Sequence, residues 1–163
     1  MLKYLFILFL NVFVYFFSFG QINKIEFIQI DSLIKINTKP VLVFVHTDWC
    51  KYCLAMKQSS LKNKEVIELI NKSFYFIEFN AEEKKDIIFK QKVYRYIPNG
   101  NNTGTNELTQ VLAQKNGEIN YPSLVFLNQS LGVIHVQSGF TTFKELIYIL
   151  NKILLNIETT IQQ

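Results

Sequence analysis

The chain has 163 residues, a formal net charge of +4 and no long run of basic residues. This weak charge excludes the basic footprint by which nucleic-acid-binding domains are recognised, so we expect no nucleic-acid partner. The chain contains two cysteines in all, so their thiols must serve each other, a metal or a partner's disulfide.

The first 20 residues have the layout of a secretory signal peptide. Lys3 precedes an apolar stretch, residues 4–19, that ends beside the small residue Gly20. The stretch is shorter than the roughly 20 residues that a membrane-spanning helix needs. We therefore expect a signal peptide over 1–20 and one domain over 21–163, with an uncleaved membrane anchor as the alternative. Both interpretations place the domain outside the cytoplasm, in the periplasm or secreted, where disulfides persist.

Hydrophobic periodicity predicts the first elements of this domain. Near-alternating apolar residues over 25–30 indicate a short strand, and Asp31 is a candidate cap for a brief helix that ends before Pro40. The continuous apolar run 41–45 is typical of a strand buried on both faces. That strand leads directly into Trp49-Cys50-Lys51-Tyr52-Cys53.

Helical spacing begins at Cys50, and Asn63 is a candidate cap or break between two helical segments. The run 74–79 indicates a second buried strand, which contains a single carboxylate, that of Glu78. Pro98 to Gly104 indicates a loop. A short helix is expected over 106–114, with Leu108, Val111 and Leu112 facing inward.

The last third of the chain predicts a hairpin and a helix. Pro122 opens a strand over 121–127, and a turn over 128–132 leads to a strand over 133–136, most simply as an antiparallel pair. Thr141 or Thr142 then caps a final amphipathic helix.

This order of elements, together with Trp49-Cys50-Lys51-Tyr52-Cys53 and Tyr121-Pro122, resembles the thioredoxin superfamily over residues 25–155. The resemblance implies an α/β, thioredoxin-like fold: a central mixed β-sheet flanked by helices, with an insert over 86–121 before the strand that Pro122 opens. Asn80-Ala81-Glu82 and the residues around the cysteines are also similar to secreted thioredoxin-like proteins of Bacteroidetes-type bacteria.

The spacing of the two cysteines suits thiol-disulfide exchange. A cysteine in the first turn of a helix faces unpaired backbone N–H groups and the positive end of the helix dipole, which stabilise a thiolate. We therefore expect Cys50 to be the nucleophile. Cys53, one turn further on, is expected to be the resolving thiol that attacks the mixed disulfide.

The resemblance implies roles for the residues around the cysteines. Trp49, Tyr121 and Pro122 would bind substrate, with Pro122 in a cis peptide bond against the cysteine pair. Lys51 and Tyr52, between the cysteines, would tune the redox potential. Simple solvation of Lys51 and ordinary packing of Trp49 are the alternatives.

Phe44 stands six residues before Cys50, where thioredoxins commonly carry a buried aspartate that moves a proton to the resolving thiol. Glu78 is the candidate substitute, because its strand should neighbour the strand before Cys50 and burial would raise the pKa of its carboxyl group. The alternative is a rim carboxylate paired with a lysine.

Two other uses of the cysteines remain open. His46 and His135 could join them in a zinc or copper site, although zinc ligands are usually paired at short spacing on both halves of the site. A permanent structural disulfide would contribute little, because the loop that it closes is short.

We therefore expect a protein thiol-disulfide oxidoreductase that acts as a monomer through Cys50 and Cys53, with no bound cofactor or metal. Its partners would be protein disulfides or dithiols and a membrane or periplasmic redox protein. The sequence leaves the direction of electron flow open. The competing class is a thioredoxin-like binding module or metal chaperone that uses the cysteines without turnover.

Overall fold

A computed structural model describes residues 20–161, with side chains described as far as Thr159. The expected signal segment therefore lies, apart from Gly20, outside the described residues. Within residues 20–161, no helix is both long enough and apolar enough to cross a membrane.

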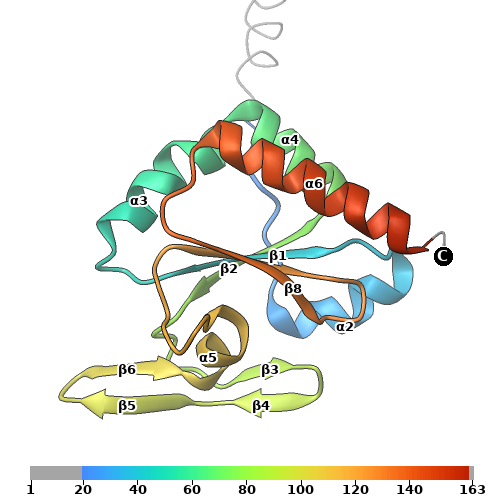
Figure 1. The fold of residues 1–163 in the computed structure, drawn as a ribbon. Helices are drawn as coiled ribbons and strands as arrows, with labels where there is room; N and C mark the ends of the chain where they lie inside the picture. Colours follow the sequence, from blue (N-terminus) through green and yellow to red (C-terminus); the bar gives the residue numbers. More distant parts are fainter. Residues whose placement is uncertain (1–19, 162–163) are drawn as a thin grey trace, which may run out of the picture.

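A four-stranded mixed sheet forms the centre of the domain (Figure 1). Its strands are β1 (Val41–His46), β2 (Tyr75–Asn80), β7 (Ser123–Leu127) and β8 (Val133–Ser138). They lie in the order β2-β1-β7-β8, with β1 and β2 parallel and the other neighbouring pairs antiparallel. The expected hairpin between the last two strands is confirmed.

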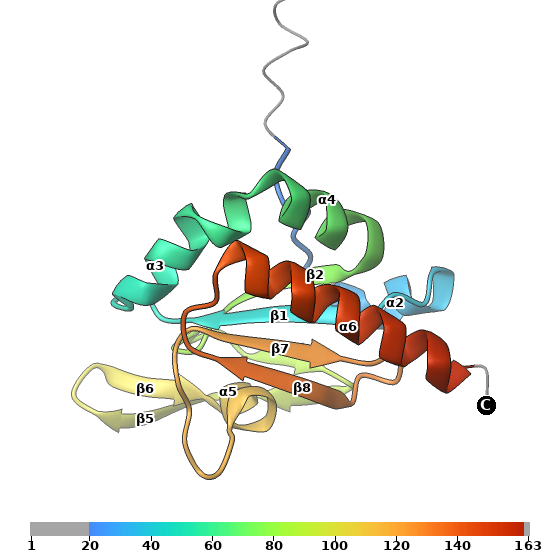
Figure 2. The same ribbon diagram turned by 45° about the horizontal axis from the view of Figure 1, so that its top comes forward.

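Helices cover both faces of this sheet (Figure 2). One face carries α3 (Lys51–Gln58), α4 (Lys64–Ser73) and α6 (Phe143–Ile161). The other carries α2 (Phe27–Ile36) and α5 (Glu107–Ala113). The mixed sheet flanked by helices that the resemblance implied is therefore present.

The apolar sequence of β1 follows from this sandwich, because every residue of the strand is buried. Successive strand side chains point to opposite faces. Val41, Val43 and Val45 pack in the core on the α2 and α5 side. Leu42 and Phe44 pack in the second core, which contains both cysteines.

The strand expected over 25–30 is wrong, because α2 begins at Phe27. Glu26 and Gln29 form a capping box at its start, and Phe27 and Ile30, three residues apart, are its buried positions. Extended pairing stops just before this helix, with an isolated parallel bridge between Lys24 and Phe76 of β2 and a hydrogen bond from the N–H of Ile25 to Phe76. Asp31 lies inside the helix and does not cap it.

The expected break at Asn63 is confirmed. A single 3-10 turn, Ser60–Lys62, follows α3, and the Asn63 side chain then accepts hydrogen bonds from the backbone N–H groups of Glu65 and Val66 at the start of α4. Thr142 caps the final helix: its hydroxyl oxygen accepts a hydrogen bond from the backbone N–H of Glu145, and its own N–H donates to the Glu145 side chain.

The insert is more regular than the sequence indicates. It forms two hairpins, β3 (Ile87–Phe89) with β4 (Lys92–Tyr94) and β5 (Tyr96–Gly100) with β6 (Thr103–Asn106). The loop expected from Pro98 to Gly104 is therefore wrong except at its tip. Gly104 lets the strands approach, because a Cβ atom there would collide with the ring of Tyr96.

The insert helix is confirmed as α5, but one of its inward positions is wrong. Leu108 and Leu112 are buried, whereas the side chain of Val111 is 54% exposed. The buried face of α5 consists of Leu108, Thr109, Leu112 and Ala113, and Val111 lies on the opposite side of Leu108 from the rest of that face.

Candidate active site

The two cysteines lie where β1 ends and α3 begins. Cys50 is the N-cap residue of α3, and its sulfur accepts a hydrogen bond of 3.0 Å from the backbone N–H of Cys53. A sulfur in this position receives both a direct N–H donor and the positive end of the helix dipole. The helix start is therefore built to stabilise negative charge on Cys50.

Cys50 and Cys53 are joined by a disulfide bond. Both are buried in the core beneath α3, but Cys50 keeps 7% of its surface exposed and Cys53 only 1%. Of the two sulfur atoms, that of Cys50 is the better placed for attack by or on a partner.

The sheet register brings Tyr121 and Pro122 to the cysteines. Ser123 of β7 lies opposite Val45 of β1, so the residues just before Ser123 meet the end of β1 where the cysteine motif starts. The Tyr121–Pro122 peptide bond is cis, the isomer that the resemblance implies. Tyr121 packs against the core cluster that contains both cysteines.

Trp49 lies over this junction as an exposed aromatic surface. Its side chain is 65% exposed, and its ring meets that of Tyr121 edge-on at 6.0 Å between centroids. The indole and phenol rings thus form one aromatic wall at the start of the cysteine motif, called the substrate wall below. Lys51 and Tyr52 point into solvent from the first turn of α3, and Tyr52 is 69% exposed.

Glu82 is a site residue that sequence reasoning missed. Its carboxylate accepts a 3.0 Å hydrogen bond from the indole nitrogen of Trp49. The pKa of Tyr121 is raised by burial and then by the negative charge of Glu82. A sequence signal existed, because Glu82 follows β2 and the carboxyl ends of parallel β1 and β2 must meet at one edge.

Phe44 places an apolar side chain next to the cysteines. It is buried in their core cluster, lies opposite Glu78 in the sheet register, and stacks on the ring of His46 at 5.6 Å. Phe44 and Glu78 therefore share the face of the sheet that α3 covers, as expected for neighbouring strands.

The carboxylate of Glu78 is held by three basic side chains. Lys24 and Lys57 form ion pairs with it, and the Nε2 atom of His46 lies 3.4 Å away. Burial alone raises the pKa of Glu78, but the hydrogen bonds and charges of the two lysines outweigh it, so the net pKa is below the ordinary value. The expectation of a raised pKa is therefore wrong, because the lysines come from segments that the strand pattern does not place.

Each of the two histidines lies beside an aromatic ring and is influenced by the positive charge of nearby lysines. The pKa of His46 is lowered by burial and then by the positive charge of Lys57. His135 lies 5.7 Å from the ring of Phe126, and its pKa is lowered by burial and by Lys115 and Lys152. Across residues 20–161, no three His, Cys, Asp or Glu side chains are grouped as metal ligands.

Comparison with known proteins agrees with this geometry. A family model described as a thioredoxin-like domain matches residues 30–154, which include the cysteines, Glu82, the whole insert and the cis-proline. No match to the chain was found among curated proteins.

Several solved structures share the fold at low sequence identity. A thioredoxin from Thermus thermophilus is 16% identical, with a TM-score of 0.60 over 84% of this chain and 90% of that one. A DsbH oxidoreductase is 15% identical, with a TM-score of 0.55 over 85% of both chains. A thioredoxin-fold protein from Helicobacter pylori is 23% identical, with a TM-score of 0.54 over 72% of this chain and 70% of that one. At these identities the likeness concerns the fold alone.

Proposed function

Because the chain belongs to the thioredoxin-like domain family, we propose that it is a thiol-disulfide oxidoreductase that works through Cys50 and Cys53. The observation that carries the proposal is the sulfur of Cys50 at the start of α3, where it accepts the N–H of Cys53 while disulfide-bonded to that same residue. A helix start that favours a thiolate makes Cys50 both a nucleophile and a good leaving group.

The exchange has two steps. With the pair reduced, the Cys50 thiolate attacks one sulfur of a substrate disulfide, which forms a mixed disulfide and releases a substrate thiolate that takes up a proton. Cys53 then gives up its proton and attacks the sulfur of Cys50, which releases the second substrate thiol. Two electrons pass to the substrate and the Cys50–Cys53 disulfide forms; an oxidase runs the same steps in reverse.

The neighbouring side chains suit substrate binding rather than chemistry. Trp49 and Tyr121 offer an aromatic wall beside the disulfide, and Pro122 carries no N–H, so an incoming extended peptide would pair with the backbone at Tyr121. Lys51 and Tyr52 are exposed between the cysteines, where they meet partners and adjust the redox potential. Glu78, on the strand next to β1, would relay the proton that Cys53 gives up.

We place this activity outside the cytoplasm. The support is the basic start and apolar stretch of residues 1–20, the pattern of an export signal. Thiol exchange there needs a partner that supplies or removes two electrons, so a membrane or periplasmic redox protein belongs to the proposal. The protein would act as a monomer.

The test measures the reduction potential of the purified protein in defined glutathione buffers, with metal content assayed on the same sample. A value near about −270 mV would identify a reductase and one near about −120 mV an oxidase. Stoichiometric zinc or copper would instead favour the metal chaperone.

Trapping then separates turnover from mere binding. Cys53→Ser should accumulate a mixed disulfide with a model disulfide protein, because the resolving thiol is gone. Cys50→Ser is the matched control and should trap far less, since Cys53 is 1% exposed. Equal trapping by both variants, or none by either, would reject the assignment and favour the binding module.

A further inference from the structure

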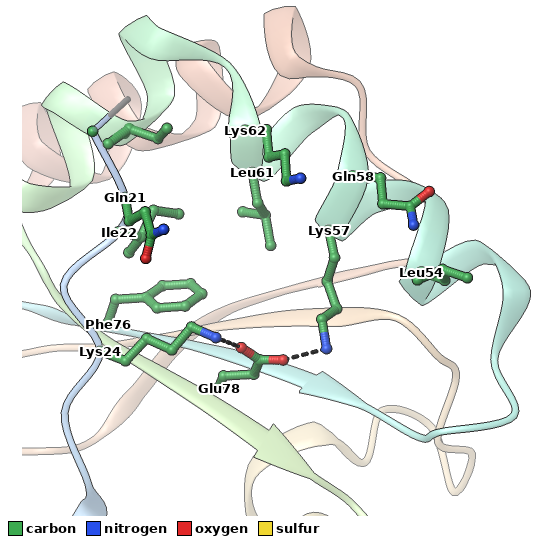
Figure 3. A pocket seen from close by; sticks show the side chains of 12 residues that line it. Gln21, Ile22, Lys24, Leu54, Lys57, Gln58, Leu61, Lys62, Phe76 and Glu78 are labelled. Atoms are coloured by element: carbon green, nitrogen blue, oxygen red, sulfur yellow. Dashed lines mark hydrogen bonds and ion pairs between the residues drawn. The ribbon is translucent and has the colours of Figure 1, made fainter. Parts of the chain in front are cut away.

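A cavity of about 690 Å³ lies beside α3, and neither Trp49 nor Tyr121 lines it (Figure 3). Residues 20–24, α3, the following 3-10 turn, α4 and β2 enclose it. Hydrogen bonds hold the N-terminal segment in place as one wall of the cavity. The N–H of Ile25 donates to the carbonyl of Phe76, and the Asn71 side chain donates to the carbonyl of Gln21 and accepts from the N–H of Asn23. The cavity is thus a formed feature of the domain, of the size that small-molecule sites have.

Most of the cavity wall is apolar. Figure 3 shows the side chains of Ile22, Leu61 and Phe76 gathered on one side, with Leu54 at the opposite rim. Leu54 is 54% exposed although it lines the cavity. An apolar wall open to water favours an alkyl or aromatic ligand, because binding removes apolar surface of both partners from water.

The charged groups of the cavity are mostly positive. Three lysines, Lys24, Lys57 and Lys62, line it with a single carboxylate, Glu78, which leaves a surplus of two positive charges. Lys24 and Lys57 converge on Glu78 at one end, while Lys62 lies across the cavity from it (Figure 3). Among the described side chains, none pairs with the ammonium group of Lys62.

We propose that this cavity binds an amphipathic anion: an alkyl chain that lies on the apolar wall, with a carboxylate or phosphate group held by Lys62 and the other lysines. An apolar ligand without charge would leave the surplus positive charge uncompensated, and a cation would be repelled. Neither cysteine lines the cavity, so this proposal can fail or succeed whatever the outcome for the proposed oxidoreductase activity.

Removing Glu78 should strengthen the binding of an anion in the cavity, although Glu78 is itself one of the lining residues. Its carboxylate competes with a bound anion for Lys24 and Lys57, so its removal should free both lysines and strengthen binding. Glu78→Gln is therefore expected to raise the affinity for the anion about threefold, and Lys62→Gln to lower it about threefold. This is the effect expected of one exposed ion pair. Lys64→Gln is the matched control, because Lys64 lies two residues from Lys62 but not in the cavity and pairs with Glu68.

Calorimetric titration of the full chain with dodecanoate, below the concentration at which it forms micelles, tests this. Dodecanoate should bind with amide NMR shifts around Leu54, Leu61 and Phe76, and dodecanol should bind more weakly. Equal binding of dodecanol, shifts centred on Trp49, or equal effects of Lys62→Gln and Lys64→Gln would each overturn the proposal. So would the absence of binding.

The anionic group could belong to a free acid or to a lipid, and flotation with vesicles distinguishes the two sources. Vesicles of phosphatidylcholine with phosphatidylglycerol are compared with vesicles of phosphatidylcholine alone. Lys62→Gln is compared with the unchanged chain, because the apolar residues 4–19 are present in both and contribute equally to vesicle binding. Retention on anionic vesicles that depends on Lys62 identifies a lipid, whereas dodecanoate binding without it identifies a free acid.

Discussion

The indole nitrogen of Trp49 donates a 3.0 Å hydrogen bond to Glu82, a residue from the segment that follows β2. That segment is itself fixed, because the N–H of Ala81 donates to the carbonyl of His46 at 2.7 Å and the N–H of Glu82 to the Asn80 side chain. An indole that is 65% exposed is therefore held in one orientation beside the disulfide.

Replacing Glu82 with alanine should loosen that orientation. Loss of one hydrogen bond of this kind costs about 1 kcal/mol, so we expect kcat/KM for a disulfide substrate to fall about threefold to fivefold. Trp49 is the single tryptophan of the chain, so its time-resolved fluorescence anisotropy reports the motion directly.

Two further variants separate position from charge. Glu82→Gln keeps an acceptor for the indole and should restore the anisotropy, while the pKa of Tyr121 falls toward its ordinary value but stays raised by burial. Glu83→Ala is the control, because it removes a neighbouring acid whose carboxylate accepts from the backbone N–H of Lys85 and not from Trp49. If it lowers kcat/KM as much as Glu82→Ala does, the role of the Trp49–Glu82 bond is disproved.

Glu78→Gln tests both roles of Glu78. The folded-state pKa of Glu78 is below its unfolded value of about 4.5, so its ionised form stabilises the fold above that value and the contribution disappears as pH falls through the folded pKa. The variant should lose about 1 kcal/mol of unfolding free energy at pH 7, and this loss should become smaller as the pH falls below about 4.5. Urea denaturation at pH 7 and pH 3 measures it.

The same variant decides the proton relay. A relay predicts slower release of the mixed disulfide from the Gln variant, with a changed dependence on pH. Release that is unchanged between pH 5 and 8 would remove Glu78 from the mechanism and leave it as the ionic link between Lys24, Lys57 and β2.

Local patterns predicted the parts of the fold that local physics determines. The buried strand 41–45, the cap at Asn63, the hairpin after Pro122 and the cysteine at a helix start all follow from residues within a few positions of one another. The second hairpin of the insert did not follow, because Pro98, Gly100 and Gly104 lie inside β5 and β6 and are residues that usually indicate loops.

The site was predictable where a motif carried it and not where distant segments meet. Glu78 was found as an acid in an apolar strand, but its partner Lys24 lies 54 positions away and enters through an isolated bridge. The sign of its pKa shift depends on that contact. Glu82 was missed for the same reason, since its partner Trp49 is 33 positions away.

His46 should make stability fall in mild acid. Burial and the positive charge of Lys57 lower its folded-state pKa below the unfolded value of about 6.5. The negative charges of Glu78 and Asp48 raise the pKa but do not outweigh them. The unfolded chain therefore binds more protons between the two values, and stability declines as pH falls through about 6.5, by at most about 1.4 kcal/mol per pH unit for one group.

Urea denaturation between pH 7.5 and 5.5 measures that slope. His46→Gln should reduce it, and His135→Gln should reduce it further, because the pKa of His135 is also lowered. The double variant removes both histidines of the chain and should be nearly flat. A slope that persists in full would assign the acid sensitivity to other groups.

Asn106 connects the insert to the segment that holds Trp49. It is fully buried; its side-chain nitrogen donates to the carbonyls of Glu83 and Lys85, and its side-chain oxygen caps α5 at Leu108. Asn106→Ala loses the cap and leaves two carbonyls without this donor, so we expect a loss of about 2 kcal/mol in urea denaturation.

Asn106→Ser is the matched variant, because its hydroxyl oxygen can still cap α5 whereas both amide donors are lost. It should fall between the wild type and Asn106→Ala in stability. Since Glu82 lies beside these bonds, both variants should also increase the motion of Trp49. Unchanged Trp49 anisotropy in a destabilised Asn106→Ala protein would show that the insert stabilises the domain without positioning the substrate wall.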